Sequence, residues 1–323
     1  MRLRHARPSQ LASIRVITCL AGGVGAAKFL SGLVQVVPPA EVTAVVNTGD
    51  DIVLHGLRIS PDLDTVTYTL AGAVNPETGW GLRGETWAAM EALDRYSGQT
   101  WFRLGDRDLA THLFRTQRLS EGASLDQVTA EITRAWGLGL SLLPMTNQRV
   151  ETRITLKDGT ERGFQEWFVG QRHATAVSSV AFQGASESEP APGVIEAIET
   201  ADVLVVCPSN PIVSIGPLLA VPGIADALAA RRDDCVAISP IVAGKALKGP
   251  ADALMSDLGH ASSVAGVARL YAKFTSVLLV DDSDLGLAPE VEAEGLRCVV
   301  TPTVMSGPDQ ARDLARATLA AIR

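Results

Sequence analysis

Four aspartates lie within a stretch of fifteen residues, close behind a short apolar run. Asp50 and Asp51 follow Glu41–Val46, and Asp62 and Asp64 come a little further along. Carboxylates at this spacing repel one another unless protons, basic side chains or a cation neutralise them. An oxygen-ligated cation such as Mg²⁺ suits such a cluster, above all beside a bound phosphate. We therefore take all four as candidate Mg²⁺ ligands, with Asp50 and Asp64 ranked first.

Helix capping is a second explanation for part of this cluster. Asp62 and Asp64 precede a helical segment that begins at Thr65, where an aspartate side chain can accept from the first backbone N–H groups. Capping accounts for one or two of the acids but hardly for all four. We therefore expect at least two of them to have a function.

A glycine-rich turn supplies the expected phosphate site. Val16–Leu20 reads as a buried strand, Gly22, Gly23 and Gly25 interrupt it, and helical residues including Lys28 follow. This order leaves backbone N–H groups free at a helix N-terminus, where they and the helix dipole attract anions. The turn lacks the Gly-Lys-Ser/Thr ending of a Walker loop and the third glycine of a dinucleotide fingerprint. A tight turn with no ligand is the alternative.

More polar residues follow two later apolar runs. Ser209, Asn210 and Ser214 come after Val203–Cys207, and Ser239 ends the next run. Ligands of open α/β sheets bind at the carboxyl ends of the strands. We therefore expect these side chains to share one rim with the glycine turn.

One predicted helix carries a further polar group. Asp106 is a good N-cap, and Asp108, Thr111, His112 and Arg115 share one helical face. Such a face can meet a polar ligand, but a pair such as Asp108 with His112 can equally be an ordinary salt bridge. His112 alone is more typical of a satisfied interior histidine than of a catalyst.

Composition limits the class of protein. The chain has 323 residues, 46% of them apolar, and a net charge of −8, which argues against nucleic acid as a partner. Its four cysteines form no CxxC or Cys/His cluster, so we expect free thiols in a reducing cytoplasm. No run approaches the roughly 20 apolar residues of a membrane span, and we expect no membrane partner. Residues 1–13 read as a disordered leader.

The elements needed to position these residues alternate between strand and helix. The expected fold is α/β, with a doubly wound, mainly parallel, Rossmann-like sheet and an inserted helical and antiparallel β subdomain. The insertion rests on an Asp158-Gly159 hairpin signal between two short runs, Arg149–Leu156 and Arg162–Val169. Phe164, Trp167 and Phe168 fit hairpin packing better than a ring-stacking platform. The predicted division is a nucleotide-binding core at 14–119 and 199–323, with the insertion at 120–198.

Several of these motifs together resemble one family, 2-phospho-L-lactate transferase of deazaflavin coenzyme F-420 biosynthesis, which includes a phosphoenolpyruvate-transferring variant. The resemblance covers nearly the whole chain apart from the leader and Ser186–Pro192. The motifs are Ala21-Gly22-Gly23-Val24-Gly25, Asn47-Thr48-Gly49-Asp50-Asp51, Ser60-Pro61-Asp62-Leu63-Asp64-Thr65, Leu104-Gly105-Asp106-Arg107-Asp108, Leu142-Leu143-Pro144-Met145, Phe164-Gln165-Glu166-Trp167, Pro208-Ser209-Asn210-Pro211, Ser214-Ile215-Gly216-Pro217 and Ser239-Pro240-Ile241.

The resemblance implies a Mg²⁺-dependent transfer between two substrates by a homodimer. The donor is a guanosine diphosphate ester of a three-carbon acid, and the acceptor is the deazaflavin Fo. The terminal ribityl hydroxyl of Fo attacks the donor phosphate, and GMP leaves. Asp64 is our choice to orient or deprotonate that hydroxyl, and Asp50 is the other candidate catalytic residue. By family position Asp64 and Arg103 also resemble acceptor-binding residues. The candidate substrate-binding residues are Gly22, Gly23, Gly25, Lys28, Asp62, Asp64, Thr65, Arg103, Asp106, Ser209, Asn210, Ser214 and Ser239.

Two other functions were weighed. A non-catalytic nucleotide-sugar-binding regulatory protein of the same fold resembles this chain at the glycine turn, but carries a Ser/Gly-rich segment after its paired acids. Here Ile52-Val53-Leu54-His55 follows them instead, which favours the transferase. A dehydrogenase is disfavoured by the incomplete dinucleotide fingerprint. No motif decides whether the donor carries lactate, enolpyruvate or glycerate.

Overall fold

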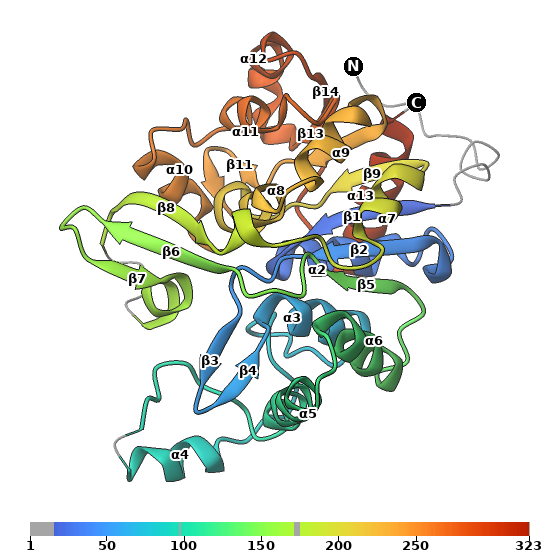
Figure 1. Ribbon diagram of the computed structural model, residues 1–323. Coiled ribbons are helices and arrows are strands. Elements are labelled where there is room, and N and C mark those ends of the chain that lie inside the picture. The colour runs from blue at the N-terminus through green and yellow to red at the C-terminus, as the bar shows by residue number, and fades with distance from the viewer. Residues whose placement is uncertain (1–15, 97, 171–174, 323) are drawn as a thin grey trace.

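A parallel seven-stranded sheet forms the centre of the molecule (Figure 1). The computed structural model describes residues 16–96, 98–170 and 175–322, so the predicted leader at 1–13 lies outside the described residues. The strand order is β14-β13-β10-β9-β1-β2-β5, and every neighbouring pair is parallel. The strands are β1 (Ile17–Ala21), β2 (Val42–Val46), β5 (Ser141–Pro144), β9 (Val203–Val206), β10 (Cys235–Ile238), β13 (Val277–Val280) and β14 (Arg297–Val300).

Strand β1 is an interior strand of this sheet, and all five of its residues are buried. Its neighbours are β2 and β9, and Leu20 is level with both Val45 and Val206. The three strands therefore end at the same height. The residues that leave them, Gly22 and Cys207 among others, begin at one edge of the sheet.

Helices cover both faces of the sheet, as the doubly wound prediction requires. One buried cluster joins Cys19 to Phe29 on α2 and Leu314 on α13, and the other joins Leu20 to residues of α7, α8, α9 and α11. Alternate residues of β1 thus point to opposite cores. These helices are α2 (Gly23–Leu33), α7 (Val194–Thr200), α8 (Gly216–Ala220), α9 (Ile224–Ala230), α10 (Ala251–Asp257), α11 (Val264–Tyr271), α12 (Ala288–Ala293) and α13 (Pro308–Ala321).

Two smaller units extend from this core (Figure 1). The first follows β2 and contains a hairpin and several helices, β3 (Ile52–Leu54), β4 (Leu57–Ile59), α3 (Pro61–Leu70), α4 (Ala88–Asp94), α5 (Asp108–Ser120) and α6 (Leu125–Ala135). The second is an antiparallel sheet in the order β7-β6-β8, with β6 (Glu151–Leu156), β7 (Glu161–Gly163) and β8 (Val177–Gln183). A short pair, β11 (Ile241–Val242) with β12 (Lys245–Ala246), lies between β10 and α10.

The division at residues 120 and 198 stays a prediction, but two details of it need correction. Strand β5 falls inside 120–198 and yet pairs with β2 in the central sheet. The run Arg162–Val169 is not one strand, because β7 ends at Gly163 and a helical turn, Glu166–Gly170, follows. The antiparallel unit is therefore confined to the stretch from β6 to β8.

Over the described residues, no individual helix has the length and apolar composition needed to cross a membrane. One pair bent by 95°, Pro211–Ala220 with Ile224–Ala230, reaches the required length and composition only when its two members are joined.

The α2 turn makes a prediction about stability. A Cβ added at Gly25 would overlap the backbone carbonyl oxygen of Pro208, so close packing onto the loop after β9 excludes any side chain there. Glycine at position 25 therefore has a structural reason, in addition to the expected close approach of its backbone to a phosphate. Gly25→Ala should lower the free energy of unfolding by about 1–3 kcal/mol, because overpacking must displace backbone. Chemical denaturation measures this loss.

Gly286→Ala is the matched control. A Cβ at Gly286 would meet no heavy atom within 4 Å. Its denaturation midpoint should stay near that of the wild type, and an equal loss in both variants would disprove the packing explanation.

Candidate active site

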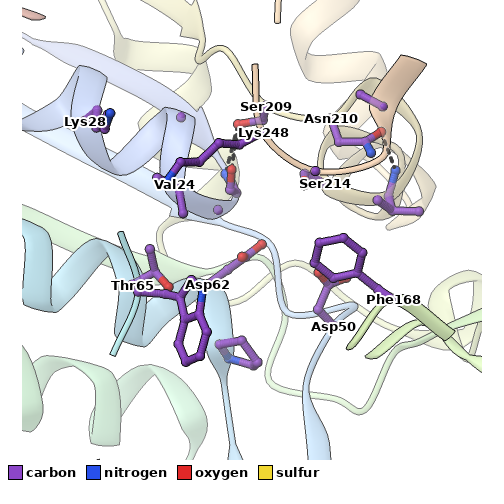
Figure 2. Close-up of a pocket in the computed structure, with 18 of the residues that line it drawn as sticks. Val24, Lys28, Asp50, Asp62, Thr65, Phe168, Ser209, Asn210, Ser214 and Lys248 are labelled. Atoms are coloured by element: carbon purple, nitrogen blue, oxygen red, sulfur yellow. Dashed lines mark hydrogen bonds between the residues drawn. The ribbon is translucent and has the colours of Figure 1, made fainter. Parts of the chain in front are cut away.

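A cavity of about 640 Å³ opens at the carboxyl ends of the central strands. Figure 2 draws part of its lining, with Asp50 and Asp62 projecting from one side and Ser209 and Ser214 from the other. Of the residues predicted from sequence, those that line it are Gly22, Gly23, Gly25, Lys28, Asp50, Asp62, Asp64, Thr65, Arg103, Ser209, Asn210, Ser214 and Ser239. Asp51 and Asp106 are the two predicted residues outside this lining.

The glycine turn is held by the segment that follows β9. The Ser209 hydroxyl accepts from the Gly22 N–H at 3.2 Å and donates to the Gly22 carbonyl at 2.9 Å. Gly23 has φ +70°, a left-handed conformation that favours glycine. A Cβ at Gly22 would lie 2.7 Å from Cβ of Ser214. The turn is therefore rigid, and its conformation requires glycine at Gly23.

Asp50 and Asp62 are buried acids without a basic partner among the described residues. Asp62 accepts from the Asn47 amide at 3.0 Å, and one Asp50 oxygen has no hydrogen-bond partner. Burial raises the pKa of Asp62 to about 6, and burial together with the Asp62 charge raises the pKa of Asp50 well above its ordinary value. This pair therefore resists carrying two negative charges unless a cation joins it.

Asp64 differs from them because Arg115 neutralises it. The two side chains form a buried bidentate pair, with the Nη1–Oδ2 contact at 3.1 Å, and Arg115 is 1% exposed. The helix α3 already begins at Pro61, and Asp62 and Asp64 lie in its first turn without capping it. The capping explanation for these acids is therefore wrong.

The predicted polar face of α5 stands behind Asp64. His112 Nε2 lies 3.3 Å from Asp108 and its Nδ1 lies 3.7 Å from Asp64, while the Tyr68 hydroxyl donates to Asp108 at 2.6 Å. Burial opposes ionisation of Asp108, but these partners lower its pKa on balance. Asp108, His112 and Tyr68 also line the cavity. The face therefore contains the predicted contact between Asp108 and His112, while its contact with a polar ligand stays a prediction.

Asp106 has a structural task. Its carboxylate accepts from the N–H groups of Ala88 and Ala89 at 3.0 Å, at the start of α4. Glu85 in turn accepts from the N–H groups of Arg107 and Asp108, at the start of α5. Asp106 was expected to cap its own helix, so this prediction is corrected: the two acids cap each other's helices.

Asp51 points away from the cavity that Asp50 lines. It accepts from the Ser60 hydroxyl at 2.6 Å, and its other oxygen has no partner. Burial raises the pKa of Asp51 to about 8 although the Ser60 hydrogen bond opposes the rise.

Lys28 and Lys248 border the glycine turn, and the sequence pattern predicts only Lys28 there. Lys28 donates to the Met305 carbonyl at 3.2 Å, and Lys248 donates to the Thr78 carbonyl at 3.0 Å. Burial and the nearby Lys248 charge lower the pKa of Lys28. Lys248 comes from a loop with no motif of its own, so its place at the turn depends on the fold.

Aromatic side chains form a further part of the wall. Phe164 and Phe168 stack with their ring centroids 5.4 Å apart and 6° between planes, and both line the cavity. Trp167 is buried and packs in the hairpin as predicted. Phe164 and Phe168 belong to the same hydrophobic cluster, in agreement with hairpin packing, and their use as a ring-stacking platform stays a hypothesis. On another wall Arg103 lies over the Trp87 ring, with its guanidinium carbon 4.4 Å from the ring centroid.

The remaining predicted residues shape the rim. Asn210 accepts from the N–H groups of Ile212 and Val213, which leaves its buried side-chain amide nitrogen without a partner in the described chain. The Ser239 hydroxyl accepts from the Ile241 N–H and donates to its carbonyl. Thr65 is buried at the cavity wall.

The donor set of the cavity fits a divalent cation. Asp50 and Asp62 offer carboxylate oxygens, which Mg²⁺ prefers, and one Asp50 oxygen lacks any partner. Asp64 is a weaker candidate ligand than the sequence ranking suggests because its two oxygens already accept from Arg115. A second acid and nitrogen cluster, Asp64 with Asp108 and His112, has the spacing of a metal site but contains this same arginine-bound carboxylate.

The sheet order and the strand-end cavity define a doubly wound, Rossmann-like α/β protein. The sequence profile of the family 2-phospho-L-lactate transferase CofD matches residues 17–297. The chain belongs to that family of transferases.

Sequence relatives agree with this assignment. The chain is 46% identical over 308 residues to a phosphoenolpyruvate transferase of Streptomyces griseus, covering 94% of this chain and 97% of that protein. It is 42% identical over 310 residues to a phosphoenolpyruvate transferase of Nocardia farcinica, covering 94% and 93%. Among solved structures, protein BH3568 from Bacillus halodurans is similar with a TM-score of 0.64 and 19% identity, over 95% of this chain and 100% of that one. The last similarity concerns the fold alone.

The Asp64–Arg115 pair makes a prediction about stability. Arg115→Met should lower the free energy of unfolding by about 3–5 kcal/mol, because it leaves a buried carboxylate without its partner. Denaturant unfolding measures the loss. The double variant Asp64→Leu/Arg115→Met should recover much of it, since no uncompensated charge remains.

Arg118→Met is the control, because Arg118 makes partly exposed ion pairs with Glu121 and Glu131. Its midpoint should hardly move. A loss in Arg115→Met no larger than in Arg118→Met would show that the buried pair has no special weight.

The raised pKa of Asp51 makes a prediction about pH. The folded protein keeps a proton that the unfolded chain releases above the ordinary aspartate pKa, so the stabilisation is complete below about pH 4 and is lost as the pH rises to about 8. In chelator, the free energy of unfolding should fall by up to about 1.4 kcal/mol per pH unit for this group. Unfolding curves between pH 5 and pH 8 measure the slope.

Asp51→Asn should flatten this slope, because an amide does not titrate. Asp158→Asn, which changes an exposed hairpin residue, is the control and should follow the wild type. If the Asp51→Asn and wild-type slopes are parallel, Asp51 is ionised in the folded protein and the interpretation fails.

Proposed function

We propose that this protein transfers a phosphoenolpyruvyl group from its guanosine diphosphate ester to the terminal ribityl hydroxyl of the deazaflavin Fo. GMP is the leaving group, and the product is a precursor of coenzyme F-420. The family and the name of relatives at 42% to 46% identity, phosphoenolpyruvate transferase, support the class of reaction and favour enolpyruvate over lactate or glycerate. One observation supports it most: a single cavity combines two lysines at a glycine turn with two uncompensated acids.

The glycine turn and the lysines suit the diphosphate of the donor. Lys28 and Lys248 both have backbone carbonyls as partners, which a phosphate can replace as the stronger acceptor. The unpartnered amide nitrogen of Asn210 and the Ser214 side chain offer further polar contacts on the same rim. We place the guanosine portion along the loops after β9 and β10.

Mg²⁺ is the proposed cofactor, with Asp50 and Asp62 as its protein ligands. When bound, it would neutralise charge on the phosphate oxygens during transfer. Asp62 is a better candidate ligand than Asp64, because Arg115 already neutralises Asp64.

Asp64 then belongs with the acceptor. Arg115 and the α5 face fix its carboxylate at the cavity wall, where it can accept a hydrogen bond from the ribityl hydroxyl and orient it. The hydroxyl oxygen forms the new bond to phosphorus, the bond from phosphorus to the GMP oxygen breaks, and a cavity carboxylate takes the hydroxyl proton. Phe164, Phe168 and Arg103 offer flat surfaces for the deazaflavin ring. We propose a cytoplasmic homodimer as the working form.

Chromatography of GMP release tests this function. Release from guanylated phosphoenolpyruvate should require both Fo and Mg²⁺, and Asp50→Asn should lower kcat by at least about 100-fold, since one ligand carboxylate is lost. Asp106→Asn, which lies outside the cavity, should retain most activity.

Full GMP release in excess chelator would exclude the metal. Tight binding of guanosine nucleotides without turnover of the lactate, enolpyruvate or glycerate donor would favour the regulatory-protein alternative.

A further inference from the structure

A second cavity of about 280 Å³ lies next to Asp51 and Ser60, which form part of its lining. It shares Ile59 with the central cavity, and the hydrogen bond between Asp51 and Ser60 forms part of its wall. Apart from Arg115, which fixes Asp64, the proposed transfer uses none of its remaining residues. A cavity of this size holds a ligand of about a dozen non-hydrogen atoms or fewer, below the usual range of drug-sized pockets.

Its inner wall contains buried polar atoms that lack partners. Thr48 is 2% exposed, and its hydroxyl has no hydrogen-bond partner in the described chain. One carboxylate oxygen of Asp51 also lacks a hydrogen-bond partner in the described chain. Buried polar groups are seldom left unpaired, so these atoms point to an occupant with polar groups of its own.

The outer wall carries positive charge. Arg58 is held by its backbone, whose N–H donates to the Thr116 hydroxyl at 2.7 Å, but its guanidinium has no acidic partner among the described residues. Arg149 pairs with Glu151 at 2.9 Å, and this exposed pair contributes little, so Arg149 can turn to a ligand at small cost. Arg115 also borders the cavity but is committed to Asp64. Asp51 is the one acid in this lining.

Two side-chain amides add uncharged donors. The Asn147 oxygen accepts from the Asp126 N–H at 2.9 Å, and the Gln148 oxygen accepts from the Glu189 N–H at 3.0 Å. Backbone donors thus fix the oxygen ends of both amides. Their NH₂ groups are left to donate to an acceptor in the cavity.

We propose that this second cavity binds a small organic oxyanion, a short carbon chain bearing one or two phosphate or carboxylate groups. Arg58 and Arg149 with the two amides supply donors for the anionic groups. Ile52, Leu119 and Val150 line the rest and suit the carbon chain. The Thr48 hydroxyl receives its missing partner from the ligand.

Isothermal calorimetry tests the site with three probes: 2-phosphoglycolate, inorganic phosphate and malonate. Arg58→Ala should weaken 2-phosphoglycolate binding by at least about tenfold, and Thr48→Val should weaken it severalfold. Arg95→Ala removes an exposed arginine that borders neither cavity and should leave the affinity within about twofold. Lys248→Ala changes only the central cavity, so a binding signal that survives it and falls in Arg58→Ala belongs to the second cavity.

The other two probes distinguish the recognised group. Binding of phosphate but not malonate identifies a phosphate site, and the reverse identifies a carboxylate site. The proposal is overturned if none of the probes binds at millimolar concentration, or if Arg58→Ala and Arg95→Ala have the same affinity as the wild type.

Discussion

The buried pair between Asp64 and Arg115 sets one acid of the site apart from the others. By neutralising Asp64, it distinguishes this acid from Asp50 and Asp62, so the cavity holds two kinds of carboxylate, while Asp51 points away from it. Asp64 is a fixed acceptor with a permanent counter-ion, whereas Asp50 and Asp62 keep their mutual repulsion and have raised pKa values. A phosphate-transfer site needs both kinds, since a cation must be attracted in one place and a hydroxyl oriented in another. The position of Arg115 on α5 therefore links a helix outside the central sheet to the chemistry at its edge.

The sheet explains how residues so distant in sequence meet. Strands β1, β2 and β9 end at one height, which brings Gly22, Asn47 and Ser209 together and lets Ser209 hold the glycine turn. The segment that follows β2 then brings α3 and α5 back to the same edge of the central sheet. The central sheet thus carries the glycine turn and Ser209, and the outer helices and the antiparallel sheet carry the aromatic wall.

Much of this could be predicted from sequence because short apolar runs that end in glycine or polar residues have few alternatives in an α/β chain. The parallel sheet and the rim of polar residues follow from that pattern. Strand β5 could not be predicted as a strand of the central sheet because it is four residues long and ends in a proline. Lys248 and Arg115 could not be assigned their contacts, since only folding brings them to the glycine turn and to Asp64. The exchange of caps between Asp106 and Glu85 likewise depends on two helices meeting in space.

The central claim is that Asp50 and Asp62, and not Asp64, hold the cation. Titration with Mn²⁺, followed by the electron paramagnetic resonance of the free ion, tests it without substrate or turnover. Asp50→Asn and Asp62→Asn should each weaken Mn²⁺ binding by at least about tenfold, while Asp64→Asn should stay within about threefold of the wild type. Thermal melts of the same samples show whether each variant is folded. An Asp64→Asn protein that is folded and loses Mn²⁺ as completely as Asp50→Asn would contradict the account.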